Sequence, residues 1–344
     1  MKLNGCLFPM CDQFPSRSVW RMSQFWKGRA SREKLFELVL VTLLTVCPLQ
    51  VLRAQDIVPR SYFITPVHSN AVILTSSFLE GGILFNDVLP ITDATATVHV
   101  SIFSYYHSLS FFGHSANITA SLPYGLENLH GKLMDNETMV YRSGLLDSTF
   151  RFAVNLKGGP AMSEKQFQSW QQKTILGVSL RVIAPTGQYD GTKLINNGSN
   201  RWAFKPELGY SRRWGHWVLD AYGAVWFFTT NPEFFSHNAF VPGTQTQSQK
   251  PIVALEGHLS YDVKPRIWLS LDANAWFGGI TSLNGVETPQ TFQTSSKIGA
   301  TASIPLRKHQ SLKVSYSSTD HVRIGGYFQS VSVSWQYSWI GRPK

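Results

Sequence analysis

A histidine, a serine and a carboxylate share one predicted face of neighbouring segments in the C-terminal half of the chain. His258 and Ser260 are two positions apart, and Asp272 follows twelve positions later. A serine hydrolase needs a general base beside its hydroxyl nucleophile and a third group that orients the base. A histidine and a serine at this spacing are also common by chance. The elements that position these side chains therefore decide what chemistry is open to them.

The stretch from 327 to 339 indicates what those elements are. Val331, Val333, Trp335 and Trp339 share one parity, and serine or glutamine occupies the positions between the apolar residues. This period of two indicates a β-strand with one apolar and one polar face. Similar segments recur along the chain, which predicts strands whose apolar face meets lipid and whose polar face meets a wet interior. A soluble β-sandwich or barrel is the alternative, but aromatic residues at strand ends are typical of membrane interfaces.

The N-terminal region has the pattern of an export signal. Basic residues precede an apolar segment from Leu35 to Leu52, and Ala54 offers a small residue for cleavage. We predict a cleavable signal peptide region over 1–54, with Met22 as an alternative start and an uncleaved anchor helix as the alternative role. No later stretch approaches the eighteen consecutive apolar residues that a membrane-spanning helix needs.

Composition narrows the function classes. The three cysteines, Cys6, Cys11 and Cys47, lie in the predicted signal region, which excludes thiol catalysis, cysteine-ligated metals and disulfides in the mature chain. The net charge is +10, but the signal region holds eight Lys and Arg against three acidic residues, so the rest carries only +5. No basic block resembles a nucleic-acid patch, and we expect no nucleic-acid partner. The ten histidines are scattered without metal-ligand spacing, and we expect no cofactor.

Twelve segments have about the length that a tilted membrane strand needs, roughly nine to eleven residues. They span residues 71–79, 96–107, 114–122, 148–157, 173–184, 201–212, 217–228, 251–262, 265–277, 296–305, 311–318 and 327–339. Short and long connections alternate between them, like the periplasmic turns and extracellular loops of bacterial barrels. The predicted fold is all-β: a transmembrane antiparallel up-and-down β-barrel of about 12 strands over 71–339. A periplasmic N-terminal segment (55–70) precedes it, and a short C-terminal tail (340–344) follows.

One connection departs from the alternation of short and long links. Residues 158–172 fall where a short turn is expected, and 162–170 is typical of a brief helix with Ser163 as its N-cap. We predict a helical turn at the periplasmic end.

Strand parity assigns side chains to the two faces of the wall. An Arg or Lys facing lipid at mid-membrane costs about 2–4 kcal/mol, so a parity that sends charges inward is informative. The residues predicted to line the lumen are Arg151, Arg181, Lys205, Glu207, Asp220, Glu256, His258, Asp262, Asp272, Lys297 and Lys313. The predicted membrane-interface aromatics are Trp202, Trp217, Phe227, Trp335 and Trp339. Segment 96–107 is less regular, because Val98 and Val100 lie on one face and Phe103 and Tyr105 on the other.

The inward set carries both signs of charge, which allows ion pairs between neighbouring strands. With a tight turn around Lys264, Glu256 is expected near Asp272 and His258 near Ser270. Two roles remain open for such a set. It forms either a polar constriction that selects what passes or a salt-bridged plug that fills a narrow lumen.

Particular segments resemble a known family. They are APTGQYD at 184–190 and NNGSNRWAFKPELG at 196–209, with shorter matches at 69–71, 112–117 and 278–279. On these motifs the chain from about Asn70 to Trp339 is similar to the meta-pathway phenol-degradation family of outer-membrane channel-like β-barrel proteins. The resemblance implies a barrel that passes aromatic or other hydrophobic small molecules, and it implies no catalytic residues. The tail beyond Trp339 departs from barrels that finish on the aromatic residue recognised during insertion.

These observations predict an outer-membrane channel for passive uptake of small hydrophobic or aromatic compounds in bacteria, gated by 123–147 and 229–250. The expected partners are outer-membrane lipid and lipopolysaccharide, the barrel insertion machinery and the hydrophobic solutes. A structural or surface-interaction barrel without transport is the alternative. A lipid hydrolase is the third interpretation, and it is disfavoured because parity points His258 and Ser260 inward, away from lipid.

Overall fold

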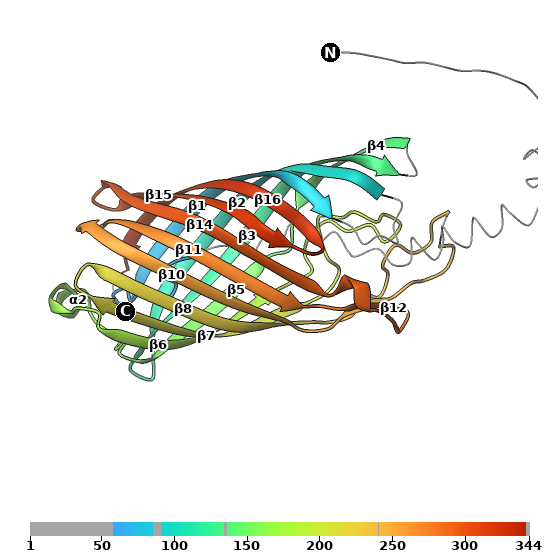
Figure 1. The fold of residues 1–344 in the computed structure, drawn as a ribbon. Helices are drawn as coiled ribbons and strands as arrows, with labels where there is room; N and C mark the ends of the chain where they lie inside the picture. The colour runs from blue at the N-terminus through green and yellow to red at the C-terminus, as the bar shows by residue number, and fades with distance from the viewer. Residues whose placement is uncertain (1–57, 85–90, 134–135, 240, 342–344) are drawn as a thin grey trace, which may run out of the picture. The chain divides into compact units, whose positions relative to one another are not determined.

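The computed structural model describes residues 58–84, 91–133, 136–239 and 241–341, and twelve of its strands form a closed antiparallel barrel (Figure 1). The wall strands are β1 (Ser69–Leu84), β2 (Ile91–Phe111), β3 (His114–Leu133), β5 (Thr149–Lys157), β6 (Thr174–Ile183), β7 (Ala203–Trp214), β8 (Trp217–Phe228), β10 (Ile252–Lys264), β11 (Ile267–Gly278), β14 (Gln293–Arg307), β15 (Gln310–Val322) and β16 (Gly325–Ile340). The predicted signal region 1–54 and residues 342–344 of the predicted tail lie outside the described residues.

The first and last wall strands seal the barrel. β1 pairs with β16 from Ser69 opposite Ile340 to Leu84 opposite Gly325, and β2 pairs with both β1 and β3. Closure satisfies the backbone of every wall strand from within the protein, which is what hydrocarbon demands of a membrane-spanning sheet. The predicted twelve-stranded antiparallel barrel is confirmed.

Side-chain exposure alternates along the wall, as a period of two requires. In β8, Asp220 and Tyr222 are buried, whereas Trp217 and Leu219 are exposed. The outward face is strongly apolar, and Leu271 of β11 is 67% exposed. A large apolar side chain at that exposure fits a wall that meets lipid rather than water.

Most of the short connections between wall strands lie at one end of the barrel. Residues 112–113, 215–216, 265–266 and 308–309 each join two wall strands. Gly113 and Gly215 have φ values of 81° and 57°, in the left-handed region that glycine enters without a Cβ clash. The opposite end has one short connection, 323–324 between β15 and β16, together with longer links. It also holds a small sheet of β9 (Gln247–Gln249), β12 (Thr281–Leu283) and β13 (Val286–Thr288), followed by the 3-10 turn η1 (Pro289–Thr291).

The long connection at the short-turn end holds the helix α2 (Glu164–Ser169), as predicted (Figure 1). Ser163 caps it: the hydroxyl accepts from the Gln166 amide, and the Gln166 side chain accepts from the Ser163 backbone at 2.9 Å. This reciprocal pair satisfies two amides that a helix start leaves open. Among the described residues, no helix has the length and apolar character needed to span a bilayer.

The prediction of a loop at 123–147 was wrong. β3 continues to Leu133 and pairs with an additional strand, β4 (Asn136–Leu145). β5 pairs with the other part of β3, from Ala116 to Ser121, so β4 and β5 share one edge of β3 with a break at 146–148. The alternation continues through this region, because Tyr124 and Leu126 are exposed while Glu127 and Leu129 are buried. Polar residues around the hairpin obscured that pattern in the sequence.

Candidate functional site

A network of ion pairs joins inward-facing side chains of β5, β7 and β10. The Lys205 ammonium lies 2.6 Å from a carboxylate oxygen of Glu256 and 3.0 Å from one of Glu207. The Arg151 guanidinium lies 3.6 Å from Glu207. The Lys205 side chain is only 4% exposed, and its two carboxylate partners are 6% and 7% exposed. A charge so deeply buried depends on its partners, because neither water nor salt screens it.

The register explains why these residues meet. Arg151 lies opposite Arg181, and Arg181 lies opposite Lys205, so three cations follow one another across β5, β6 and β7. Like charges at paired positions repel one another. Glu207, two positions beyond Lys205 on the same face, supplies the opposite charge. Five members of the predicted set, Arg151, Arg181, Lys205, Glu207 and Glu256, therefore come together here with both signs interleaved.

His258, from the opening motif, is bonded to Asp272. Its Nδ1 lies 2.9 Å from the Asp272 carboxylate, which also accepts from Ser270 at 2.6 Å and from Thr301 at 2.7 Å. His258 Nε2 and Ser260 Oγ, in contrast, have no hydrogen-bond partner among the described residues. The nucleophile-to-base hydrogen bond that hydrolysis requires is missing, although the base-to-acid bond is present.

The predicted register of this pair of strands was wrong by two positions. His258 lies opposite Asp272, not Ser270, and Glu256 lies opposite Asn274. The turn is at 265–266, with an irregularity between Asp262 and Lys264 that shifts the pairing. Asp272 consequently faces a histidine rather than a second carboxylate.

Residues 58–68, which precede β1, make contact with the interior of the barrel. The Tyr62 side chain is 1% exposed and donates a hydrogen bond to Glu207 at 3.0 Å. Its ring lies over Gly177 and Gly209, which are opposite each other in β6 and β7. Burial, reinforced by the charge of Glu207, raises the pKa of the Tyr62 hydroxyl, so it remains a donor.

Arg60 connects the same segment to two further predicted residues. Its guanidinium bonds Asp262 at 2.6 Å, and its backbone amide donates to Asp220 at 3.1 Å. Arg213 forms a second ion pair with Asp262. The guanidinium of Arg60 also lies 4.5 Å from the ring centroid of Trp268. Segment 55–70 was predicted as periplasmic, and from residue 58 onward it is tied to inward-facing groups at the short-turn end of the wall.

Lys297 and Lys313 extend the predicted set to β14 and β15. Lys297, on β14, is 5% exposed and sits opposite Asn274, while Lys313, on β15, sits opposite Ser334 of β16. The lumen-lining role of all eleven predicted residues remains a proposal.

A second part of the inner face is apolar, and sequence reasoning did not identify it. We call it the apolar inner region; its buried members are Leu79, Ile83, Ala96, Val98, Val100, Leu129, Leu146 and Phe328. They come from β1, β2, β3, β16 and the link after β4, and Ile195 of the 184–202 link packs against them. The signal was present in segment 96–107, whose apolar residues occupy both faces because one face meets lipid and the other meets this region.

The predicted interface aromatics lie on the outward face or near it. Trp202, Trp217 and Phe227 are 45%, 41% and 46% exposed, and Trp335 and Trp339 are half-buried. In β16 the Tyr337 ring contacts both Trp335 and Trp339. Their position at a membrane boundary stays a prediction.

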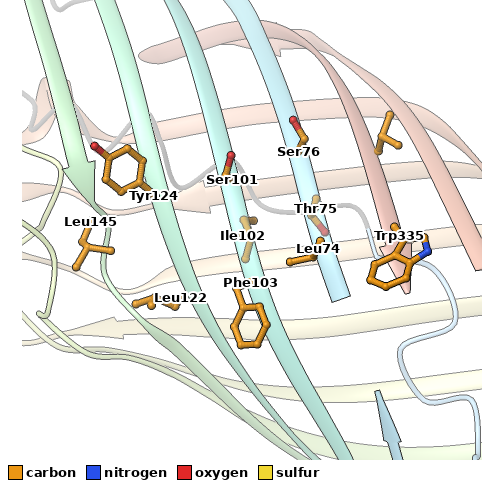
Figure 2. Close-up of a pocket in the computed structure, with 11 residues that line it drawn as sticks. Leu74, Thr75, Ser76, Ser101, Ile102, Phe103, Leu122, Tyr124, Leu145 and Trp335 are labelled. Atoms are coloured by element: carbon orange, nitrogen blue, oxygen red, sulfur yellow. The ribbon is translucent and has the colours of Figure 1, made fainter. Parts of the chain in front are cut away.

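A shallow groove runs over the outer surface of β16, β1, β2 and β3, and Figure 2 shows the side chains that line it. Leu74, Phe103 and Leu122 are 48%, 49% and 47% exposed there, with Tyr124 and Trp335 beside them. Such a surface suits hydrocarbon chains, so we assign it to the lipid-facing wall.

Comparisons with known proteins bear on this architecture. The family model described as "Putative MetA-pathway of phenol degradation" matches residues 85–337. The crystal structure of the COG4313 outer membrane channel from Pseudomonas putida F1 is 18% identical, with a TM-score of 0.69 over 83% of this chain and 100% of that chain. At that identity the likeness shows the fold alone.

Two autotransporter barrels are more distant. The transport unit of AIDA-I from Escherichia coli is 11% identical, with a TM-score of 0.48 over 90% of this chain and 98% of that one. The beta domain of Bordetella Brka is 14% identical, with a TM-score of 0.45 over 79% and 100%. No curated protein matches. The family match covers well over half of the sequence, and the chain therefore belongs to the MetA-pathway phenol-degradation family.

Proposed function

We propose that this protein is a bacterial outer-membrane channel for the passive uptake of small hydrophobic or aromatic compounds. The observation that carries the proposal is the apolar inner region, a cluster of eight buried apolar side chains inside the barrel. Binding sites for apolar ligands are lined mostly by such side chains, with few polar groups. Family membership and the fold shared with an outer-membrane channel support the same function.

The polar network gives the proposed channel its selectivity against polar solutes. Lys205, Glu207 and Glu256 hold one another in ion pairs, and Tyr62 fills the space beside them. Water and ions gain little from a lumen whose charges are already paired. The eleven predicted residues line this lumen, and Asp220 and Asp262 act as a closure at its short-turn end, where Arg60 joins segment 58–68 to them.

Transport of this kind involves no covalent step, and we assign no catalytic residue. Partner contacts follow from the setting: lipid and lipopolysaccharide around the wall, the insertion machinery during assembly, and hydrophobic solutes inside. The five predicted interface aromatics would hold the barrel at the membrane boundaries.

The same packed interior favours a second candidate, a structural or surface-interaction barrel without transport. Segment 58–68 and the ion pairs occupy the inner face at one end, as a permanent plug would. The two candidates differ in flux, because only a channel speeds the entry of a solute.

Uptake in whole cells tests the proposal. A strain that lacks the gene is compared with the complemented strain for entry of radiolabelled ethylbenzene, with sucrose as the polar control. We expect faster ethylbenzene uptake in the complemented strain and equal sucrose uptake in both. Equal ethylbenzene uptake would leave the structural barrel as the better account.

A further inference from the structure

One acidic side chain lies in the apolar inner region without a complete set of partners. Glu127 of β3 is 2% exposed, and its Oε1 has no hydrogen-bond partner within the part of the chain that the structure describes. On the opposite face of the same strand, Leu126 is 36% exposed and Tyr124 is 45% exposed, so Glu127 belongs to the inward face. A buried carboxyl oxygen without a donor is unusual, because buried polar groups are nearly always bonded.

Two close neighbours of Glu127 on the inner face are apolar. Val98 lies directly opposite on β2, and Leu129, two positions further along β3, shares the same face. Both are buried members of the apolar inner region. A carboxyl group in such surroundings is costly unless a donor reaches it.

The cation that could pair with Glu127 is bonded elsewhere. Arg142 lies opposite Glu127 on β4, but its Nε donates to the Ile195 carbonyl at 2.8 Å and its Nη1 to the Tyr141 carbonyl at 2.9 Å. No ion pair between Glu127 and Arg142 is present among the described residues. The guanidinium thus ties β4 to the 184–202 link and leaves Oε1 of Glu127 open.

We propose that Glu127 is a specificity-determining residue that accepts a hydrogen bond from the head group of the solute. The preferred solutes are small apolar molecules with one donor, either a hydroxyl or a protonated amine. This inference deepens the proposed function and rests on it. The apolar inner region binds the hydrocarbon part, and Glu127 binds the single polar group.

The same arrangement rejects hydrophobic acids. A carboxylate beside Glu127 brings two acidic groups together among apolar side chains, so that either two like charges face each other or one group must take up a proton, and both raise the energy of the bound state. A hydrocarbon without a donor enters, but it leaves Oε1 unsatisfied and gains no hydrogen bond. The channel should therefore prefer solutes with a hydrogen-bond donor, then hydrocarbons without a polar group, and then solutes with a carboxylate.

Four labelled probes of similar size separate these cases: 4-ethylphenol, 2-phenylethylamine, ethylbenzene and 3-phenylpropionate. Their uptake is measured in the deletion strain complemented with the full chain or with Glu127→Gln, Glu127→Leu or Glu80→Gln. Glu80 is an exposed carboxylate on β1, so its variant is the matched control. Heat-shifted mobility on gels confirms that each barrel is folded.

For Glu127→Leu we expect a loss of about three- to tenfold in uptake of the phenol and the amine relative to ethylbenzene, the scale of one hydrogen bond. Glu127→Gln should retain the phenol, since its amide oxygen still accepts, but lose the preference for the amine. Uptake of 3-phenylpropionate should rise in both variants, and Glu80→Gln should match the wild type.

Two other outcomes have distinct meanings. If the relative uptake of the four probes is unchanged in a folded Glu127 variant, Glu127 has a structural role and the inference is overturned. If the wild type fails to speed the uptake of any probe, including ethylbenzene, the proposed function itself is overturned and the inference with it.

Discussion

The ring of Tyr62 occupies the space that a side chain on Gly209 would need. A Cβ at Gly209 would stand 2.0 Å from the ring, and one at Gly177 would stand 2.3 Å from it. Only a pair of glycines on β6 and β7 lets the segment before β1 lie so close to the wall. The relationship makes the contact testable by adding a single methyl group.

Gly209→Ala should displace segment 58–68 from the interior. A methyl forced into a packed site costs about 1–3 kcal/mol, and the cheapest relief is movement of Tyr62. We expect higher ion conductance in planar bilayers, because the short-turn end is then less obstructed. Gly257→Ala is the control, since a Cβ at Gly257 meets no atom within 4 Å. Equal conductance in the two variants would show that Tyr62 does not obstruct the barrel.

Lys205→Met should destabilise the barrel strongly. The substitution leaves Glu207 and Glu256 as neighbouring carboxylates without their shared cation, and breaking a buried pair in this way costs about 3–5 kcal/mol. Denaturant unfolding in detergent measures the free energy of unfolding. Lys193→Met, which removes an ion pair of an exposed loop, should change it by no more than about 1 kcal/mol. A comparable small effect at Lys205 would mean that the network contributes little.

Ser260 should not behave as an enzymatic nucleophile. Its hydroxyl is buried and donates no hydrogen bond to His258, so no base is placed to remove its proton. Purified protein exposed to a fluorophosphonate probe should remain unlabelled, and Ser260→Ala should be indistinguishable from wild type in an esterase assay. Labelling of the wild type that disappears in Ser260→Ala would revive the hydrolase interpretation.

The 184–202 link should loosen only in strong acid. Hydrogen bonds from the Thr192 hydroxyl, then Lys193 and the Thr192 amide, lower the pKa of Asp190 to about 2. A depressed carboxyl pKa means that the stabilisation is complete above the unfolded value, about 3.9, and is lost as the pH falls towards 2. Pepsin cleavage within the link should therefore accelerate between pH 4 and pH 2.

Asp190→Asn provides the comparison for that experiment, because pepsin itself responds to pH. The variant lacks the titrating group. The cleavage rate of the variant divided by that of the wild type should therefore be highest at pH 4 and approach one at pH 2. A ratio that does not change with pH would contradict the assigned role of Asp190.

Much of the wall could be predicted because lipid constrains it so strongly. Asp220 and Asp272 had to face inward, since a charge directed at hydrocarbon is expensive, and both are buried on the inner face. The Ser163 cap of α2 was equally local, because its partner is three residues away. Elements that depend on residues close in sequence, or on the membrane itself, could therefore be predicted from the sequence pattern.

The interior was harder to predict because its contacts join distant residues. Tyr62 meets Gly209, and Arg60 meets Asp262, through positions that no periodicity relates. The pairing of His258 with Asp272 depends on where one irregularity falls in a turn. Glu127 fell within the predicted loop 123–147, although the apolar residues on both faces of segment 96–107 were a usable sign of an apolar interior.

The seam between β1 and β16 also constrains how the protein comes into being. Ser69 pairs with Ile340, so nearly the whole chain must be exported before β1 and β16 can pair and close the barrel. Until then two long strand edges remain open, and open edges recruit other chains. A nonsense codon anywhere in β16 would therefore yield a truncated chain that is prone to aggregate, rather than a smaller pore. Cells would have to degrade that chain.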